Sequence, residues 1–428
     1  MKSLVYSELS GHPFLSRIRY KLALASLLGV VVPMVLAMVT FGTGLSDPNQ
    51  INTAIGAALA LLVGFVAFRR LHIFPGITAG GYVVASITGS FCLLVVALVL
   101  LRVEYSRVQL TVSYLLTLIF FTYVHLRVDA RQVRFMGVVP GGATSNLPVL
   151  PLVRWVEMVN GENIKVPLEG IVADLNFDHS KEWDDEITRF ALEGIPVFHV
   201  KQAIEQLTGR VEIEHLSENP LGSLNPNNIY LKVKSVADAI AALLLLIGLL
   251  PLMVVLGIAI RMDSPGPALF RQRRIGFRST PFTVYKFRTM RVASVGEDEA
   301  AARTSAITQV NDSRITRIGA VLRRTRLDEL PQLINILRGE MSIIGPRPEA
   351  EALSQWYTKE ISFYRYRHII RPGLTGWAQI NQGHVANVDE VREKLHLDFY
   401  YIKNFSIWLD ILIALKTIHI MITGHGSR

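Results

Sequence analysis

Residues 236–260 read VADAIAALLLLIGLLPLMVVLGIAI, an apolar run that Gly248 and Pro251 interrupt near its middle. A run of this length predicts a helix in a bilayer. The proline removes a helix hydrogen bond, so it predicts a sharp kink. Basic residues flank both ends, with Lys232 and Lys234 before the run and several arginines after it. Because a spanning helix concentrates such residues on one side, we predict a re-entrant helix kinked at Pro251. An ordinary span bent at the proline is the alternative.

Further apolar runs precede this one, and each is close to the ~20 residues that a spanning helix needs. They cover Leu22 to Phe41, Ile51 to Phe68, Tyr82 to Leu101 and Val108 to His125. Hydrophobic residues make up 50% of the 428 residues, which favours a membrane protein over a soluble one. We therefore predict a transmembrane region of four helices over residues 1–130. A cleaved signal peptide in the first run is the alternative there.

The net charge of +9 fits nucleic acid, an anionic membrane face or phosphorylated substrates. Basic residues mark three ends of the four runs: Arg17, Arg19 and Lys21, then Arg69 and Arg70, then Arg127, Arg131 and Arg134. This pattern predicts that both termini of the four-helix region face the cytoplasm. No ionisable residue lies at mid-span, which disfavours a transporter. The single cysteine, Cys92, excludes an intramolecular disulfide and a thiolate metal site.

Residues 131–228 alternate strand and helix patterns, which predicts a small cytosolic α/β module of Rossmann-like type. The glycine turn at 137–142 does not match the dinucleotide-binding fingerprint and lacks an acidic ribose partner, so a structural or regulatory role is favoured over cofactor binding. The expected elements are strands at Val133 to Val139, Gly170 to Leu175, Val197 to Val200 and Val211 to Leu216, and a helix at Trp183 to Leu192.

The segment Arg323 to Gln332 reads RRTRLDELPQ and carries adjacent carboxylates among arginines. Because Pro331 fits the first turn of a helix, we predict a helix start at Glu329 with Asp328 as N-cap, where anions are favoured. A capping box between Thr325 and Asp328 is the structural alternative. The arginines, Arg323 among them, would keep both carboxylates ionised. One would then be available as a nucleophile and the other as a Mg²⁺ ligand.

Two stretches nearby present cations suited to phosphate. The strand pattern of Phe282 to Arg288 aims Lys286 and Arg288 to one side, although a charged strand face is often only solvated. Arg347 stands between two prolines, and such a rigid turn presents a guanidinium as a phosphate clamp. Pairing of Arg347 with Glu349 is the alternative.

The C-terminal region supplies further candidates. Arg371 to Asn381 offers flexible backbone, an aromatic plane and amides that could close around a nucleotide base or diphosphate; its candidate residues are Arg371, Gly373, Thr375 and Gly376. The aromatic residues of Leu395 to Ile422 suit amphipathic helices in a membrane interface, with core packing as the alternative. We read Ala293 to Val310 as a mobile insertion.

Residues from about Tyr230 onward resemble the bacterial sugar transferase family, the monotopic polyprenyl phosphate phosphoglycosyl transferases, in the large form with an N-terminal four-helix membrane region. The resemblance covers nearly half of the chain. It rests on Lys234 with Asp238, Asp263 to Pro267, Phe270 to Gln272, Lys286 to Met290, Asp312 to Thr316, Leu327 to Gln332, Gly345 to Pro348 and Pro372 to Gly376.

The resemblance implies a mainly α catalytic domain over residues 229–428, on the cytoplasmic face of a bacterial inner membrane. It implies that Asp328 attacks the β-phosphorus of a UDP-sugar, releasing UMP, and that the phosphosugar then passes to undecaprenyl phosphate. It also implies Mg²⁺ on Glu329 with Asp328 nearby, and phosphate contacts from Lys286, Arg323 and Arg347. The donor is expected to be a UDP-hexose such as glucose or galactose, in the initiation of exopolysaccharide, capsule or O-antigen repeats.

The sequence departs from the family pattern at the kink, where Leu250 precedes Pro251, and at Ser235 and Asp312-Ser-Arg314. These departures concern the helix break and local turns. Two rival functions remain open, a glycosyl transferase that liberates UDP and a non-enzymatic scaffold or regulator. A homodimer is suggested only by analogy, and no nucleic acid partner is expected.

Overall fold

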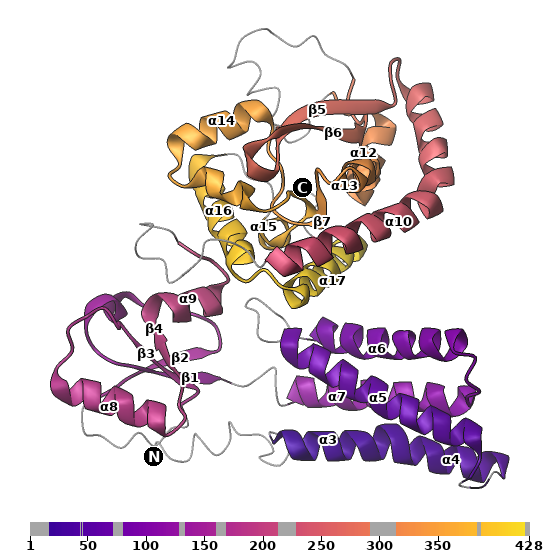
Figure 1. The fold of residues 1–428 in the computed structure, drawn as a ribbon, viewed down its shortest axis with the longest axis vertical. Coiled ribbons are helices and arrows are strands. Elements are labelled where there is room, and N and C mark those ends of the chain that lie inside the picture. Colours follow the sequence, from indigo (N-terminus) through magenta and orange to yellow (C-terminus); the bar gives the residue numbers. More distant parts are fainter. Residues whose placement is uncertain are drawn as a thin grey trace. The chain divides into compact units, whose positions relative to one another are not determined.

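The structure is a computed structural model of the chain (Figure 1). It describes residues 17–42, 44, 46–71, 80–127, 133–159, 168–212, 228–291, 314–382 and 387–423. Two compact units divide the chain, Met1–Gly209 and Arg210–Arg428, and each is described by itself. The insertion that we expected at Ala293 to Val310 and the motif residue Asp312 lie outside the described residues.

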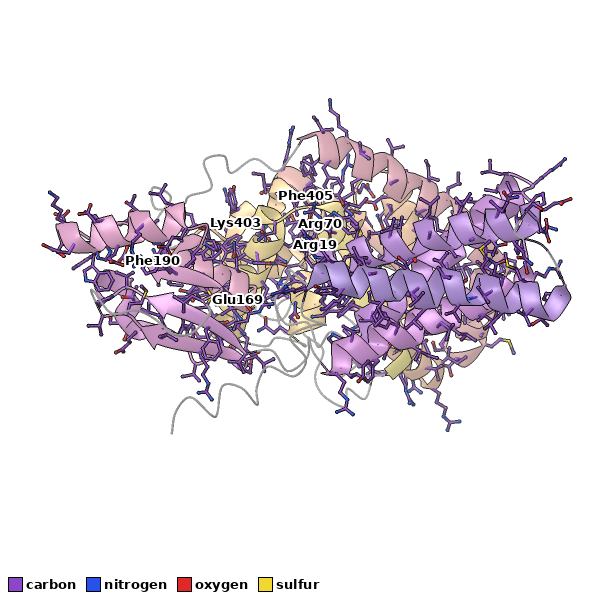
Figure 2. The ribbon with its side chains drawn as sticks, turned by 90° about the horizontal axis from the view of Figure 1, so that it is seen from below. Arg19, Arg70, Glu169, Phe190, Lys403 and Phe405 are labelled. Atoms are coloured by element: carbon purple, nitrogen blue, oxygen red, sulfur yellow. The ribbon has the colours of Figure 1, made fainter. Side chains whose placement is uncertain are left out.

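All four predicted N-terminal runs form helices. The first is α3 (Ile18–Ser26), a π turn η1 (Leu27–Val31) and α4 (Val32–Phe41), and the others are α5 (Pro48–Leu71), α6 (Gly80–Leu100) and α7 (Arg107–Arg127). The π turn ends two residues before Pro33, which has no N–H to continue the α-helical pattern. Figure 2 shows Arg19 and Arg70 at the same end of these helices.

Small residues let these helices approach closely. Gly56 faces Leu94 and Gly64 faces Ile87 and Ser90, where an added Cβ at Gly64 would lie 2.7 Å from the Ser90 hydroxyl. Membrane helices associate through such small-residue contacts, because the bilayer supplies no hydrophobic drive between them. In the described part of the chain, five helices are long and apolar enough to cross a bilayer: these four and one in the second unit. The protein is a membrane protein.

The predicted α/β module is present as a parallel sheet in the order β2-β1-β3-β4. Its elements are β1 (Arg134–Val138), β2 (Val153–Glu157), β3 (Gly170–Ala173), α8 (Lys181–Leu192), β4 (Val197–His199) and α9 (Val200–Thr208). The predictions that match are β1, β3, β4 and α8, whereas β2 and α9 were not predicted. The strand expected at Val211 to Leu216 is not found in its described residues, Val211 and Glu212.

The glycine turn after β1 packs against the end of β3. Gly142 has a left-handed φ of +61°, and an added Cβ would lie 2.3 Å from Oδ2 of Asp174. That carboxylate accepts a hydrogen bond from the Ala143 N–H at 2.9 Å. The carboxylate thus holds the backbone of the turn, and the space beside Gly142 is filled by that carboxylate, which supports a structural role for the turn.

The second unit begins with α10 (Asn228–Asp263), a 36-residue helix with Pro251 in its interior. Figure 1 shows that α10 changes direction part-way along, as expected for an internal proline. Only 6% of its most apolar stretch is buried within the described structure, against 44% in α5 and α7. This apolar surface is therefore exposed to whatever surrounds the protein.

The remaining elements build a mixed, mainly helical domain. A hairpin of β5 (Leu269–Ile275) and β6 (Pro281–Phe287) and a short parallel pair of β7 (Ser342–Ile344) and β8 (Gly373–Thr375) lie among its helices. The helices are α12 (Arg317–Thr325), η5 (Leu327–Gln332), α13 (Leu333–Leu337), α14 (Glu351–Glu360), η6 (Tyr364–Ile369), α15 (Trp377–Asn381), α16 (Val388–Lys403) and α17 (Ile407–Thr423).

The aromatic residues of α16 belong to the core of this domain. Phe399, Tyr400 and Tyr401 are buried, and the Tyr400 ring stacks on Trp377 with 5.5 Å between centroids. For these three residues the structure supports core packing over an interfacial position.

Candidate active site

The carboxylate pair lies on a 3-10 turn, η5, and not at the start of an α-helix. Arg326 takes a left-handed conformation with φ 58° and reverses the chain after α12, so the turn already begins at Leu327. The prediction that Asp328 is an N-cap is therefore wrong. The capping-box alternative is not formed either, because the Thr325 hydroxyl donates within its own helix, to the Val321 carbonyl at 2.9 Å.

Glu329 forms ion pairs with three cationic side chains from different parts of the chain. Its Oε1 lies 3.2 Å from Nζ of Lys286, 3.0 Å from Nη2 of Arg347 and 3.9 Å from Nη1 of Arg326. Burial raises the pKa of Glu329, but these cations, Arg347 foremost, outweigh burial and hold that pKa well below its usual range. Glu329 is therefore a fixed anion at the centre of a positive cluster.

Asp328, its neighbour, is 8% exposed, and its Oδ1 is a buried oxygen without a hydrogen-bond partner among the described residues. Burial, followed by the negative charge of Glu329, raises the pKa of Asp328. We expected the arginines of the motif to hold both carboxylates ionised. For Asp328 desolvation and the adjacent anion act in the opposite direction. A desolvated carboxylate with a lone pair that accepts no hydrogen bond is suited to attack on phosphorus.

The cations beside Glu329 carry perturbed pKa values of their own. Burial lowers the pKa of Lys286 to about 8, with Glu329 acting against burial. Glu329 raises the pKa of Arg347. Lys286 and Arg347, both predicted from the sequence, are thus brought to the carboxylate pair, where they can neutralise a phosphate.

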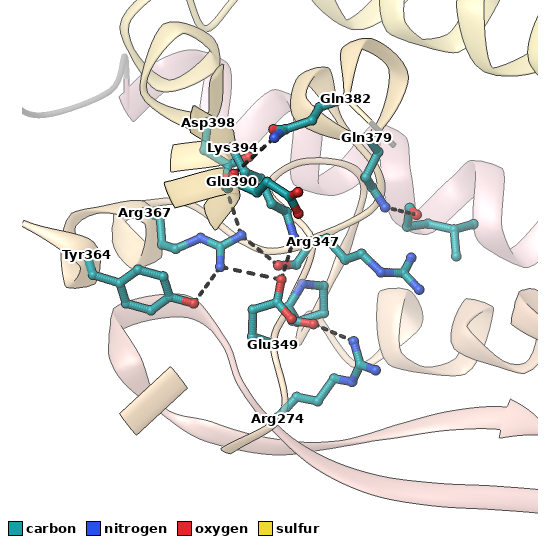
Figure 3. A network of polar contacts seen from close by, with 12 residues as sticks. Arg274, Arg347, Glu349, Tyr364, Arg367, Gln379, Gln382, Glu390, Lys394 and Asp398 are labelled. Atoms are coloured by element: carbon teal, nitrogen blue, oxygen red, sulfur yellow. Dashed lines mark hydrogen bonds and ion pairs between the residues drawn. The ribbon is translucent and has the colours of Figure 1, made fainter. Parts of the chain in front are cut away.

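The backbone of Arg347 is held by a second buried ion cluster, drawn in Figure 3. Nη2 of Arg367 donates to the Arg347 carbonyl at 2.8 Å and to Asp398 at 2.8 Å. Glu349 pairs with Lys394 at 2.5 Å, so the Arg347–Glu349 ion pair left open above is not formed in the described residues. Arg367, Lys394 and Asp398 were not predicted, because no sequence motif connects them to Arg347.

Arg274 completes this second cluster. Its guanidinium donates to the Pro348 carbonyl and to the Gln272 side chain. Burial, and then the charge of Arg347, lowers the pKa of Arg274 to about 10. The turn around Arg347 is therefore fixed from both sides.

Arg288 lies away from the carboxylate pair. The buried guanidinium donates to the Ser264 carbonyl at 2.6 Å, the Ser264 hydroxyl at 2.9 Å and the Pro265 carbonyl at 2.9 Å. It thus satisfies carbonyls at the C-terminal end of α10, where a cation is also favoured. Arg323 lies in the last turn of α12, and Arg326 rather than Arg323 joins the cluster at Glu329.

The stretch from Arg371 to Gly376 is packed and not open. The Gly373 N–H donates to the Pro346 carbonyl at 2.9 Å, and an added Cβ at Gly376 would lie 2.2 Å from the Gly345 carbonyl oxygen. The Thr375 hydroxyl meets that of Thr417 at 2.8 Å. The flexible backbone that we expected is absent from these described residues, since the glycines allow β8 to pack against the turn that carries Arg347. Arg371 lies over the Phe277 ring at 5.9 Å.

A third polar cluster attaches α10 to the rest of the unit. Nζ of Lys234 lies 2.8 Å from Asp410 and 3.6 Å from Asp238. The Ser342 hydroxyl at the start of β7 donates to Asp238 at 2.5 Å, and the Tyr401 hydroxyl donates to Asp410 at 2.6 Å. The helix and the strand leading to Arg347 are therefore connected.

The chain was compared with known protein families and with curated proteins. A family model described as bacterial sugar transferase matches residues 229–424. A UDP-N-acetylgalactosamine-undecaprenyl-phosphate N-acetylgalactosaminephosphotransferase of Aeromonas hydrophila is 41% identical over 410 residues, 95% of each chain.

Two further relatives match about half of this chain. UDP-glucose:undecaprenyl-phosphate glucose-1-phosphate transferases of Xanthomonas campestris pv. campestris and Escherichia coli (strain K12) are 41% and 38% identical over 51% and 50% of this chain, and the matches span 44% of each relative. With a relative matched along nearly its whole length, the chain belongs to the bacterial sugar transferase family.

Proposed function

We propose that this protein is a phosphoglycosyl transferase that moves a sugar 1-phosphate from a UDP-sugar to undecaprenyl phosphate, releasing UMP. The observation that carries the proposal is the buried Oδ1 of Asp328, which has no hydrogen-bond partner among the residues that the structure describes, beside a Glu329 held by three cations. The names of relatives at 38–41% identity support the same substrates.

The reaction proceeds in two displacements at one phosphorus. An oxygen of Asp328 attacks the β-phosphorus, the bond from that phosphorus to the oxygen bridging to the α-phosphate breaks, and UMP leaves with that oxygen. A phosphate oxygen of undecaprenyl phosphate then attacks the same phosphorus, and the carboxylate of Asp328 is released. Lys286 and Arg347 neutralise charge on the phosphates in both steps. Undecaprenyl diphosphate sugar is the product, which initiates exopolysaccharide, capsule or O-antigen repeats.

The carboxylate pair offers two of the ligands that a magnesium ion would need. Among the described residues no group of three or more His, Cys, Asp or Glu could hold a metal. However, Mg²⁺ binds through one or two carboxylates plus substrate phosphates, and Asp328 has a free buried oxygen. Asp328 and Glu329 would hold the ion, whose charge offsets that of the diphosphate. Oε1 of Glu329 already faces Lys286 and Arg347, so Glu329 needs its other oxygen for this role.

We further propose that the catalytic unit lies on the cytoplasmic face of a bacterial inner membrane and that α10 is re-entrant. Basic residues at one end of the N-terminal helices, such as Arg19 and Arg70, support a cytoplasmic position for that end. For α10 the support is Pro251 in its interior, its bend in Figure 1 and its exposed apolar surface.

UDP-N-acetylgalactosamine is the first donor to test, ahead of the glucose and galactose donors that we expected from sequence, because the relative matched over 95% of its length is named for that sugar. The test measures nucleotide released from a panel of UDP-sugars by purified protein in lipid, with Mg²⁺ and undecaprenyl phosphate. UMP from one donor supports the proposal. UDP would indicate a glycosyl transferase, and neither nucleotide with any donor would indicate a scaffold.

A further inference from the structure

A groove of about 770 Å³ runs between the second half of α10 and the start of β5. One wall is a stripe of α10 at helical spacing, Val254, Gly257, Ile258 and Arg261. The neighbouring side of the same helix packs inward, where Met253, Leu256 and Ile260 contact the core. The groove is therefore formed by the side of α10 that the domain leaves uncovered.

The surface of the groove combines hydrocarbon with positive charge. Ile258 and Phe270 are exposed hydrophobic side chains on its two walls. Arg261 and Arg271 line it as well, both are exposed, and neither has an acidic partner within the described ranges. Apolar walls with unpaired cations are suited to an amphiphile that has a hydrocarbon chain and an anionic head.

The groove adjoins the candidate active site through the hairpin. Phe270 is the cross-strand partner of Lys286 in the β5–β6 register. Directly opposed residues in an antiparallel pair project to the same face. Lys286 lies 3.2 Å from Glu329. A hydrocarbon chain that passes Phe270 would thus bring its head group toward the cation we assign to phosphate.

We propose that this groove holds the isoprenoid units nearest the phosphate of the polyprenyl phosphate acceptor. The inference rests on the proposed function and deepens it, because it assigns a binding surface for the lipid tail. The continuity from Phe270 to Lys286 favours the acceptor over a bilayer phospholipid, which would have no reason to approach the carboxylate pair.

A matched pair of glycine substitutions in α10 tests the proposal. At Gly257 an added Cβ meets only the Ala268 Cβ at 3.9 Å, an ordinary contact, so the longer side chain of Gly257→Leu would fill the groove. At Gly248 nothing lies within 4 Å of an added Cβ, so Gly248→Leu is the control. Both changes replace glycine by a better helix former and are not expected to unfold α10.

The measurement is steady-state kinetics in nanodiscs together with the UMP burst formed without acceptor. Gly257→Leu should raise the KM for undecaprenyl phosphate about tenfold, which corresponds to a loss of about 1.4 kcal/mol of binding. The KM for the UDP-sugar and the burst amplitude should not change, and the burst shows that the variant is folded. Gly248→Leu should behave as the wild type.

Two outcomes would overturn the proposal while leaving the proposed function intact. One is an unchanged KM for undecaprenyl phosphate in Gly257→Leu. The other is an effect of Gly257→Leu that appears only when the nanodisc contains phosphatidylglycerol, which would identify a phospholipid as the occupant. Absence of UMP from the wild type with every donor would instead contradict the proposed function, on which the inference depends.

Discussion

Two glutamates, the buried Glu329 and the partly buried Glu349, lie in similar positive surroundings but have different neighbours. Each has cations close enough to hold its pKa well below the usual range in spite of burial. Beside Glu329 is Asp328, with a buried oxygen that has no partner in the described part of the chain. In the cluster of Glu349, the second carboxylate is Asp398, which Arg367 meets at 2.8 Å.

The difference indicates that the cluster of Glu329 can take part in the reaction, whereas the cluster of Glu349 stabilises the fold. At Glu329 an anion attracts phosphate-binding cations while Asp328 stays available as a nucleophile. At Glu349 every carboxylate just named has its own cation. Arg347 joins the two, because its side chain reaches Glu329 and its carbonyl is held by Arg367. We expect changes in the first cluster to affect the rate and changes in the second to affect stability.

The largest effect is expected from Asp328→Asn, which keeps the shape of the side chain and removes the nucleophile. The rate of UMP release should fall at least about 10³-fold, as for other lost nucleophiles. The unfolding midpoint should stay the same or rise, because a buried carboxylate, one oxygen of which has no partner in the described part of the chain, is replaced by a neutral group. A variant that keeps more than a tenth of the activity would exclude Asp328 as the nucleophile.

Next in size is Arg367→Met, which breaks the second cluster. Asp398 would be left buried beside a neutral side chain, and breaking such a pair costs about 3–5 kcal/mol. Thermal unfolding in detergent should show a lower midpoint. Arg365→Met, at an exposed position of the same turn, is the control and should have little effect. Equal midpoints for the two variants would mean that the second cluster is not structural.

Arg347→Lys tests the residue that joins both clusters. A lysine keeps the charge but lacks the planar guanidinium that binds phosphate through two hydrogen bonds. We expect kcat/KM for the UDP-sugar to fall about 10- to 100-fold with little change in the unfolding midpoint. Arg273→Lys, on an exposed side chain paired with Glu351, should be close to wild type. Equal kcat/KM for wild type and Arg347→Lys would remove Arg347 from the phosphate site.

A smaller effect should appear in the pH profile. Burial lowers the pKa of Lys286 from 10.5 to about 8, so activity that needs its ammonium should fall as pH rises through about 8. Lys286→Arg should shift this limb upward. Stability has the opposite sign: between these pKa values the unfolded chain binds more protons, so this group makes the folded state more stable as pH rises. A profile that is identical in Lys286→Arg would contradict the assignment.

The smallest effect is expected at Thr375, which the sequence suggested as a substrate contact. The structure pairs its hydroxyl with that of Thr417, so Thr375→Val should cost about 1 kcal/mol of stability. The KM for the UDP-sugar should not change. If that KM rose about tenfold, Thr375 would contact the donor after all.

Much of the fold followed from patterns that are local in sequence. Apolar runs predicted α5, α6, α7 and α10, and alternation predicted β6. The conformation around the carboxylates did not follow, because no pattern shows that Arg326, a residue other than glycine, takes a left-handed φ.

The structure brings together Lys286, Glu329 and Arg347, with Asp328 beside Glu329, and strand alternation, a rigid proline turn and the motif resemblance had suggested these residues. Arg288 lies away from the carboxylate pair because residues two apart on an extended strand are about 6.6 Å apart, and that separation brings Arg288 to the end of α10. The partners of the second cluster come from distant helices, so only the fold reveals them.

The role of Asp328 as the nucleophile is tested most directly by a search for the covalent intermediate. The protein is incubated with Mg²⁺ and the UDP-sugar that yields UMP, without undecaprenyl phosphate. It is then digested, and the masses of its peptides are measured by mass spectrometry. We predict a sugar phosphate on the peptide that contains Asp328, lost when undecaprenyl phosphate is added and absent in Asp328→Asn. UMP formed only when both substrates are present, with no adduct on that peptide, would contradict it and indicate direct transfer between the substrates.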